Sequence, residues 1–457
     1  MGSGNARATT ERGLGWVLAI RFASHALPPL VAATVWNVPE RKPTIEAALK
    51  VVESGDEIVL APGTYREHHL DPRGREVTLR SVETDSPEPT VIDGDGYGPI
   101  LIFRSGEGPT MRVVGLTLRG ARPSPLGPGG GVWCQNASPQ FEGCRIIDNL
   151  AEHGGGGIRI RNGAPRILDT VIGDNRVTGI VSGGGGVYCR NAAPTFLRCE
   201  IAENRALDGD GGGLECHESS PTLISCHIRS NQCPRGAGGG LASHWNSSPR
   251  LRGCRIAKNR ATHGGGVVTS GTGALTLQGT ALVDNTSEGD GGGLMAYEGR
   301  IQLTNCLVAR NQAEGRGGGA HIGRDATVLA DFVTWTQNRA RSGGPAEGAG
   351  HLVLKNSIVW DNEPPPLRPR AQRWSADWCN LEDDAAGQGN RAQPPRFRSF
   401  RSFDYVLRGN SPCIDAADPS LEDGLPWSDF HAAYETMNRP RADMGAYGGP
   451  AGRLWQP

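Results

Sequence analysis

A repeat of about 27 residues dominates the middle of the chain. Eight copies run from about residue 129 to residue 338, and each begins with GGG and ends in asparagine. The closing asparagines are Asn149, Asn175, Asn204, Asn231, Asn259, Asn285, Asn311 and Asn338, with a degenerate ninth at Asn362. Glycine and proline break each copy into runs too short for helices. The period therefore predicts a solenoid of short strands.

Apolar residues alternate within each copy, as inward-facing positions of a strand do. Three such strands recur, and in the first complete copy they contain Val132, Phe141 and Ile146. Three strands per coil predict a triangular coil, and stacked coils bury apolar ladders that no single repeat could bury alone. We expect about a dozen coils in an all-β parallel β-helix.

The two ends of the repeat region differ from its middle. Residues 43–54 have apolar residues at helical spacing and are followed by Gly55, which predicts a capping helix over the first coil. After Asn362 the pattern gives way to Pro364-Pro365-Pro366, which indicates an irregular cap. The expected parts are a leader or disordered N-terminus over 1–36, the β-helix with its N-terminal cap over 37–363, and the C-terminal cap over 364–457.

Residues 16–36 form the most apolar stretch of the chain. Val31 and Ala33 are the small residues that would allow a signal peptidase to cut after Ala33. Arg21 and His25 interrupt the stretch, so a disordered N-terminus is an equal alternative to a signal peptide. A membrane-spanning helix is not expected, because about 20 largely uninterrupted apolar residues would be needed.

The charge of the chain argues against two classes of partner. Its formal net charge is -1 at pH 7, whereas binding to nucleic acid or to an anionic membrane surface normally needs a clustered basic excess. We therefore expect no nucleic-acid partner. The oligomeric state is left open.

The terminal segments carry a family resemblance. TIEAALKVVESGDEIVLAPGTYREHHL and TVIDGDG near the N-terminus, with NSPCIDAADPS and RPRADMGAYGGP near the C-terminus, resemble the opening and closing segments of bacterial right-handed parallel β-helix repeat proteins of the pectin-lyase-like superfamily. The resemblance covers most of the chain. It implies a right-handed parallel β-helix and an exported protein, found outside the cell, in the periplasm or on the cell surface. It also implies that any substrate is a polysaccharide.

Known catalytic signatures of that superfamily are missing. The chain has no GHG, RIK or DPHD sequence, and Asp383-Asp384 stands alone in the cap. Gly63 to Glu67 resembles a GxYxE motif of pectin methylesterases, but no catalytic aspartate motif accompanies it, so we interpret the segment as structural. On this evidence enzymatic activity is uncertain, and the absence of signatures favours a non-enzymatic protein.

Length variation locates the face that is free to change. From each closing asparagine to the last glycine of the next GGG the distance varies from 7 to 12 residues, whereas the rest of each repeat has 18 or 19. Insertions gathered at one corner of a repeat array often mark the binding face, and loops on a rigid scaffold tend to carry function. We therefore expect function on the strand that follows this corner.

The outward positions of that strand form a candidate binding strip. Aromatic rings stack on sugars, and guanidinium forks bind uronate or sulfate groups, so the strip suits an acidic polysaccharide or cell-surface glycan. Its candidate residues are Trp133, Arg159, Arg161, Tyr188, Arg190, His244, Trp245, Tyr297 and His321. Glu215 and His217 are the candidate catalytic acid and base, because alternate residues of a strand point the same way. An ordinary solvated face explains the same residues equally well.

Metal and disulfide sites are weaker hypotheses. Asp208 and Asp210 could supply oxygen ligands to Ca²⁺, but they lack a calcium-loop spacing, and a solvated turn explains them better. No other cofactor is expected. The 11 cysteines contain no CxxC pair. Cys189 with Cys216, or Cys379 with Cys413, could bridge in an exported protein, although in-register strands give poor disulfide geometry.

Three functions remain open from the sequence. The first is an exported protein that binds an acidic polysaccharide along the strip. The second is a non-catalytic surface solenoid that acts as an adhesin or spacer. The third is a polysaccharide lyase or glycoside hydrolase that uses Glu215 and His217.

Overall fold

The computed structural model describes residues 33–82, 89–123, 130–180, 183–365, 373–382, 387–398, 405–421 and 442–448. The chain has two compact units, Met1–Ala33 and Thr34–Pro457. Only Ala33 of the first unit is among the described residues, so the fold below is that of the second unit. The predicted leader over 1–36 therefore lies almost wholly outside the described residues. The one helix among them is not long or apolar enough to cross a membrane.

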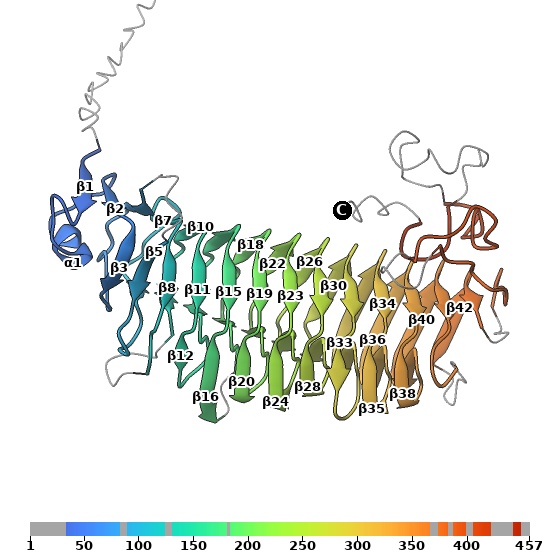
Figure 1. Ribbon diagram of the computed structural model, residues 1–457. Helices are drawn as coiled ribbons and strands as arrows, with labels where there is room; N and C mark the ends of the chain where they lie inside the picture. The colour runs from blue at the N-terminus through green and yellow to red at the C-terminus, as the bar shows by residue number, and fades with distance from the viewer. Residues whose placement is uncertain are drawn as a thin grey trace, which may run out of the picture. The chain divides into compact units, whose positions relative to one another are not determined.

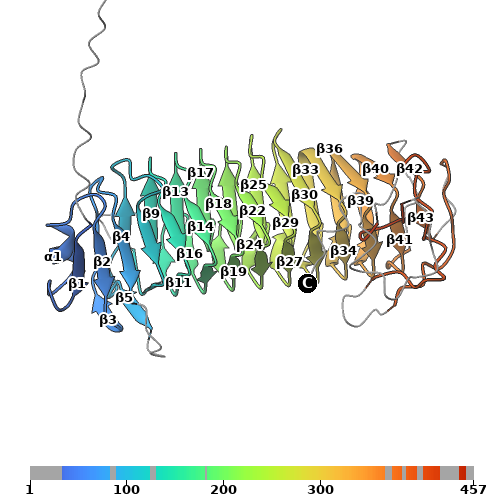
Figure 2. The ribbon, with the colours of Figure 1, turned by 90° about the horizontal axis from the view of Figure 1, so that it is seen from above.

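Short strands wind into stacked coils, and every coil pairs in parallel with the coils before and after it (Figures 1 and 2). The described strands make three sheets of 22, 13 and 8 strands. The first sheet consists of two rows of strands that merge where β33 (Leu294–Thr304) and β36 (Ala320–Asp331) run through both.

The first row of the first sheet follows the GGG segments. Besides β33 and β36 it contains β6 (Leu101–Phe103), β9 (Val132–Gln135), β13 (Ile158–Arg161), β17 (Val187–Arg190), β21 (Leu214–His217), β25 (Leu241–His244), β29 (Val267–Ser270) and β39 (Ala346–Gly348). The second row contains β1 (Val35–Val38), β2 (Glu57–Leu60), β4 (Thr78–Ser81), β7 (Arg112–Val114), β10 (Gln140–Glu142), β14 (Arg166–Leu168), β18 (Thr195–Leu197), β22 (Thr222–Ile224), β26 (Arg250–Arg252), β30 (Ala274–Gln278), β40 (His351–Lys355) and β42 (Trp374–Asp377).

The second and third sheets complete the coils. The second sheet contains β3 (Gly63–Arg66), β5 (Thr90–Asp93), β8 (Thr117–Arg119), β11 (Arg145–Ile147), β15 (Val171–Gly173), β19 (Glu200–Ala202), β23 (His227–Arg229), β27 (Arg255–Ala257), β31 (Ala281–Val283), β34 (Leu307–Ala309), β37 (Thr334–Thr336), β41 (Ile358–Trp360) and β43 (Asn380–Leu381). The third contains β12 (Leu150–Ala151), β16 (Arg176–Ile180), β20 (Arg205–Asp208), β24 (Gln232–Ala237), β28 (Arg260–His263), β32 (Thr286–Ser287), β35 (Gln312–Arg316) and β38 (Arg339–Ser342).

The inward ladders predicted from the repeat are confirmed. Val132, Phe141 and Ile146 are fully buried, and so are their equivalents in the next coil. The length-variable corner is itself a strand, which adds the third sheet to the strands read from the sequence. The sequence pattern does not reveal these strands, because several of them have a single small inward residue, as Ala206, Cys233 and Ala261 show.

The closing asparagines form one buried ladder along the solenoid. Asn204 Nδ2 donates to Asn231 Oδ1 at 3.0 Å and to the Ile172 carbonyl, and the same pattern repeats from Asn149 to Asn362. The asparagines do not take the left-handed backbone that such a turn suggests. The residue before each one takes it, as in Glu203 with φ of +60°. This leaves the amide free to bond along the axis.

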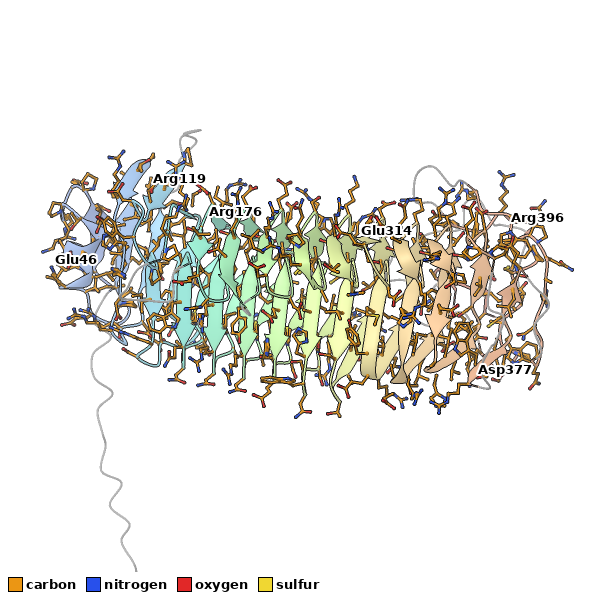
Figure 3. The ribbon with its side chains drawn as sticks, turned by 90° about the horizontal axis from the view of Figure 1, so that it is seen from below. Glu46, Arg119, Arg176, Glu314, Asp377 and Arg396 are labelled. Carbon is orange, nitrogen blue, oxygen red and sulfur yellow. The ribbon has the colours of Figure 1, made fainter. Side chains whose placement is uncertain are left out.

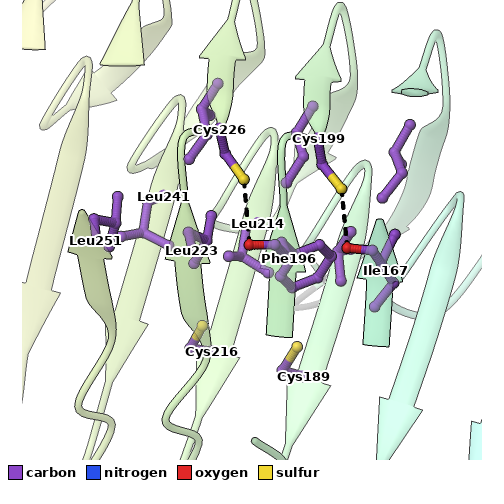
Figure 4. Close-up of a cluster of buried hydrophobic side chains, with 14 of the residues drawn as sticks. Ile167, Cys189, Phe196, Cys199, Leu214, Cys216, Leu223, Cys226, Leu241 and Leu251 are labelled. Carbon is purple, nitrogen blue, oxygen red and sulfur yellow. Dashed lines mark hydrogen bonds between the residues drawn. The ribbon is translucent and has the colours of Figure 1, made fainter. Parts of the chain in front are cut away.

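At one inward position of the repeat, buried cysteines such as Cys199 alternate with the buried Thr170 and Thr280 of other coils. Cys199 Sγ donates to the Ile167 carbonyl and Cys226 Sγ to the Phe196 carbonyl, one coil apart (Figure 4). All 11 cysteines are buried free thiols. The Cys189 and Cys216 strands are paired in register but carry no disulfide.

Helix α1 (Ile45–Leu49) caps the first coil, as expected, although it is shorter than residues 43–54. Thr44 is its N-cap, and the Glu67 carboxylate accepts hydrogen bonds from the amides of Ile45 and Glu46 at 2.8 Å. A carboxylate at the start of a helix stabilises the unpaired amides there. The structural role assigned to Gly63 to Glu67 is therefore confirmed for Glu67.

The C-terminal part does more than close the last coil. Strands β42 and β43 extend the solenoid past residue 363, and later segments pack on the outer face of the second sheet. There Leu307, Phe332 and Ile358 form a buried cluster with Tyr405 and Met444 of the cap. Figure 3 shows outward side chains along the whole solenoid, from Glu46 near the first coil to Arg396 in the cap.

Candidate functional site

The candidate strip is in the predicted register. At the first outward position of the first row, Trp133, Arg159, Tyr188 and Glu215 are consecutive partners across β9, β13, β17 and β21. Two residues further on, the partners in order are Gln135, Arg161, Arg190, His217, His244 and Ser270. The coil of β25 has one extra residue near Trp245 compared with the other repeats, and this residue does not shift the pairing.

The first outward position is largely covered. Ala242, Val268 and Met295 form a buried cluster on the outside of the sheet, and Glu215 is only 5% exposed. The cause is the corner glycines. Gly211 has φ of +66°, and a Cβ there would lie 2.8 Å from Glu215 Cβ. The corner thus folds back over the strand, which a larger residue would prevent.

Four polar side chains meet on β21, β25 and the corner before β21. His217 Nε2 lies 2.7 Å from Glu215 Oε1, and His244 Nε2 lies 3.9 Å from the same oxygen. Asp210 Oδ2 lies 3.1 Å from His244 Nε2, while Asp210 Oδ1 accepts a hydrogen bond from the Ala237 amide at 2.6 Å. His244 Nδ1 lies 2.7 Å from the Ser270 hydroxyl. We call Asp210, Glu215, His217 and His244 the polar cluster.

One oxygen of the polar cluster has no partner among the described residues. Glu215 Oε2 is buried and unbonded, and it faces Gly183, where a Cβ would lie 2.5 Å from it. Burying a carboxylate oxygen without a hydrogen bond or a cation is costly. The cluster therefore has an electrostatic demand for a further positive or hydrogen-bonding group.

Charges within the polar cluster shift two pKa values. Burial alone would lower the pKa of His244, but the hydrogen bond to Asp210, with the charges of Asp210 and Glu215, raises it. Burial opposes ionisation of Asp210, and its bonds to His244 and the Ala237 amide lower its pKa overall. Both shifts favour a charged pair of His244 and Asp210.

Aromatic rings border the polar cluster, and a cationic group adjoins one of them. The rings of Tyr188 and Trp245 lie 5.4 and 5.0 Å from the His217 ring. The Arg159 guanidinium lies 5.4 Å from the Tyr188 ring centre, a cation–π distance. Trp245 is 52% exposed.

The other predicted residues lie apart from this group. Trp133 stands three coils from Glu215 and contacts Arg104 at 6.0 Å. His321 stands four coils away on the other side, roughly 20 Å at the spacing of stacked strands. Burial lowers the pKa of His321, and its Nδ1 atom is unbonded among the described residues.

The two aspartates considered for Ca²⁺ have separate partners. Asp208 pairs with Arg235 at 2.7 Å, and Asp210 belongs to the polar cluster. Sequence reasoning missed the contact of Asp210 with His244, because Asp210 reaches it from the corner of the preceding coil. The remaining candidate, Tyr297, is 44% exposed on β33. The cavities beside Arg310, beside Trp360 and beside Lys50 include no residue of the strip.

The handedness of the coils follows from a family comparison. Residues 130–290 match the model of the right-handed β-helix region. The solenoid is a right-handed parallel β-helix. The β-helix is also similar to the crystal structure of pectate lyase Pel9A, with 12% identity, a TM-score of 0.41, and coverage of 91% of this chain and 95% of that one. No curated protein matches the chain significantly.

Proposed function

We propose that the β-helix binds an acidic polysaccharide over the coils of β13, β17, β21 and β25. The observation that carries the proposal is a set of three arginines, Arg159, Arg161 and Arg190, which have no carboxylate partner among the described residues. Arg159 lies against the Tyr188 ring, and the exposed Trp245 lies against His217, the strand partner of Arg190.

Arginines on other faces of the β-helix are commonly paired across coils. Arg198 pairs with Asp169 at 2.6 Å, and Arg316 pairs with Asp290 at 2.7 Å. Arg161 instead stands directly opposite Arg190. Like charges at opposed positions destabilise a sheet, so a bound anion would relieve the repulsion.

The environment of Arg159 supports the same ligand class. Burial, with the nearby charges of Arg161 and Arg190, lowers the pKa of Arg159 despite the opposing effect of Tyr188. Uronate carboxylates and sulfate esters fit guanidinium forks, and aromatic faces pack on the apolar faces of sugar rings. An acidic polysaccharide offers both chemistries in a repeating chain.

This proposal includes export of the protein, because polymeric acidic glycans are encountered outside the cytoplasm. The apolar stretch of residues 16–36 is the feature that motivates it. Fractionation of the native host, followed by N-terminal sequencing of the mature protein, tests whether cleavage occurs after Ala33.

Binding can be tested with polygalacturonate and heparin, against neutral dextran as the negative probe. The Arg161→Ala, Arg190→Ala double variant should weaken binding at least about tenfold, because each charge-assisted contact contributes about 1.5–3 kcal/mol. Arg166→Ala, an exposed arginine of β14, is the matched control and should bind like the parent. Measurements in excess chelator exclude any metal effect.

Equal binding of the parent and the double variant would contradict the proposal. Absence of binding to every acidic probe would favour the non-catalytic structural solenoid instead. A second candidate, a polysaccharide lyase, is favoured by the 2.7 Å contact of Glu215 with His217. The same incubations test for lyase activity, because a lyase would release unsaturated products that absorb in the ultraviolet.

A further inference from the structure

We propose that Glu215, His217 and His244 bind a divalent transition-metal ion, with Zn²⁺ as the representative, and that Asp210 supplies a fourth donor. One ligand atom from each of the first three residues lies within 4.8 Å of the others. The inference goes beyond saccharide binding and does not depend on it. Two imidazoles and carboxylates are a donor set that suits Zn²⁺ and similar ions better than Ca²⁺.

The β-helix places these donors through its register. Glu215 and His217 alternate on β21 and therefore point to the same face, and His244 on β25 is the direct partner of His217. Stacked coils are about 4.8 Å apart, so donors on adjacent coils reach one ion without movement of the backbone.

The distances are close to those of a metal site. Donor atoms around tetrahedral Zn²⁺, bonded at about 2.0–2.1 Å, are roughly 3.3 Å apart. Glu215 Oε1 is 2.7 Å from His217 Nε2 and 3.9 Å from His244 Nε2, so one pair must open and the other close by about 0.6 Å. The remaining pair of ligand atoms, from His217 and His244, lies within 4.8 Å.

The buried Glu215 Oε2 atom supplies independent support. It is unbonded among the described residues, and its side chain is only 7% exposed. A cation beside this carboxylate would compensate the charge that burial leaves unsatisfied. His217 and His244, 20% and 13% exposed, remain accessible enough for an ion to enter.

Neighbouring groups are arranged to orient the ligands. The Ser270 hydroxyl, 2.7 Å from His244 Nδ1, can accept a hydrogen bond from Nδ1–H and leave the Nε2 lone pair free for the metal. The Ala237 amide holds the Asp210 carboxylate next to the same Nε2 atom. Such outer partners fix the tautomer and ring orientation of ligating histidines.

The test uses the full-length protein, stripped with chelator and titrated with Zn²⁺ by calorimetry, with bound metal counted by mass spectrometry. We expect one Zn²⁺ per chain. His217→Ala, His244→Ala and Glu215→Gln should each weaken binding by more than about 100-fold, and Ser270→Ala, which removes only an outer partner, by about tenfold. Co²⁺ should give the visible absorption of a tetrahedral site, lost in the same variants.

His227→Ala is the matched control, because His227 is an exposed histidine of β23 on the second sheet, and it should bind Zn²⁺ like the parent. Affinity should also fall as the pH is lowered, because protons compete with the metal for the ligand atoms. No binding by the parent, or unchanged affinity in Glu215→Gln and His244→Ala, would overturn the proposal. Circular dichroism identifies misfolded variants, and the nearly isosteric Glu215→Gln and Ser270→Ala still decide the outcome if an alanine variant misfolds. Saccharide binding is measured separately, in the presence of chelator. Failure of the metal proposal can therefore be distinguished from failure of the saccharide proposal.

Discussion

The contact between His244 and Asp210 makes the stability of the polar cluster depend on pH. The folded-state pKa of His244 is raised, so its contribution is complete below the unfolded value of about 6.5 and is lost as pH rises through the folded pKa. The folded-state pKa of Asp210 is lowered, so its contribution is present above about 3.9 and is lost as pH falls through the folded pKa. The pair is therefore most stabilising between these limits.

Asp210→Asn should accordingly destabilise the protein most near pH 5.5. The expected loss is about 1–2 kcal/mol there and less at alkaline pH, because the contribution of charged His244 is lost as pH rises through its raised folded-state pKa. Urea unfolding near pH 5.5 and at alkaline pH in the presence of chelator measures the difference. A loss of equal size at both pH values would show that the charge on His244 contributes nothing.

At the residue scale the sequence located part of the polar cluster. Glu215 and His217 could be paired because alternation within one strand is a local property. The position of His244 depended on an inserted residue, and the structure absorbs it at Trp245, whose φ is +57°. Asp210 could not be assigned, because its contact depends on how a corner of variable length folds.

At the scale of the element, the asparagine ladder joins the coils. Asn231 accepts hydrogen bonds from the backbone and side-chain amides of Asn204 and donates to Asn259 Oδ1 and the Ile201 carbonyl. Its side chain is fully buried. Removal leaves several buried groups without partners, each of which costs about 1–3 kcal/mol.

Asn231→Ala should therefore lower the free energy of unfolding by about 3–5 kcal/mol. The matched control is Asn246→Ala, since Asn246 is exposed and bonds only to Thr272 among the described residues, and its effect should stay within about 0.5 kcal/mol. Equilibrium unfolding of both variants provides the comparison. Similar losses in the two variants would mean that the ladder is not an important source of stability.

The strands could be predicted from the sequence to different degrees. Strands with two or three inward apolar residues, such as β9 and β13, follow from alternation alone. Strands of the third sheet did not, because β20 and β28 each bury only one small residue. A single buried position carries no period that a sequence pattern could reveal.

At the scale of the whole molecule, the cap covers an apolar face of the second sheet. Met444→Asp would place a charge in the buried cluster with Phe332 and Ile358, and burial of an unpaired charge is strongly unfavourable. The cap should detach and expose that face, which gives concentration-dependent association by light scattering. Ala392→Asp, at an exposed cap position, is the control and should stay like the parent.

A Met444→Asp protein that elutes and scatters like the parent at all concentrations would contradict the covering role of the cap. The sequence predicted a cap but not its position, because irregular segments have no period that links them to a particular sheet. The outward apolar residues of β34 and β41 were the available sign, since Leu307 and Ile358 would otherwise face water.

The asparagine ladder gives the β-helix a direction. Every Asn–Asn bond points the same way, because each Nδ2 atom from Asn149 to Asn338 donates to the Oδ1 atom of the next asparagine, so the two ends of the ladder present different groups. Two β-helices could extend the ladder only by stacking head to tail. Head-to-tail stacking that does not close into a ring gives an open filament. At one end Asn149 Oδ1 accepts from the Ala121 amide, and at the other Asn362 Nδ2 donates to the Trp335 carbonyl. Both terminal groups are thus occupied within the chain, and the ladder has no free end from which polymerisation could start.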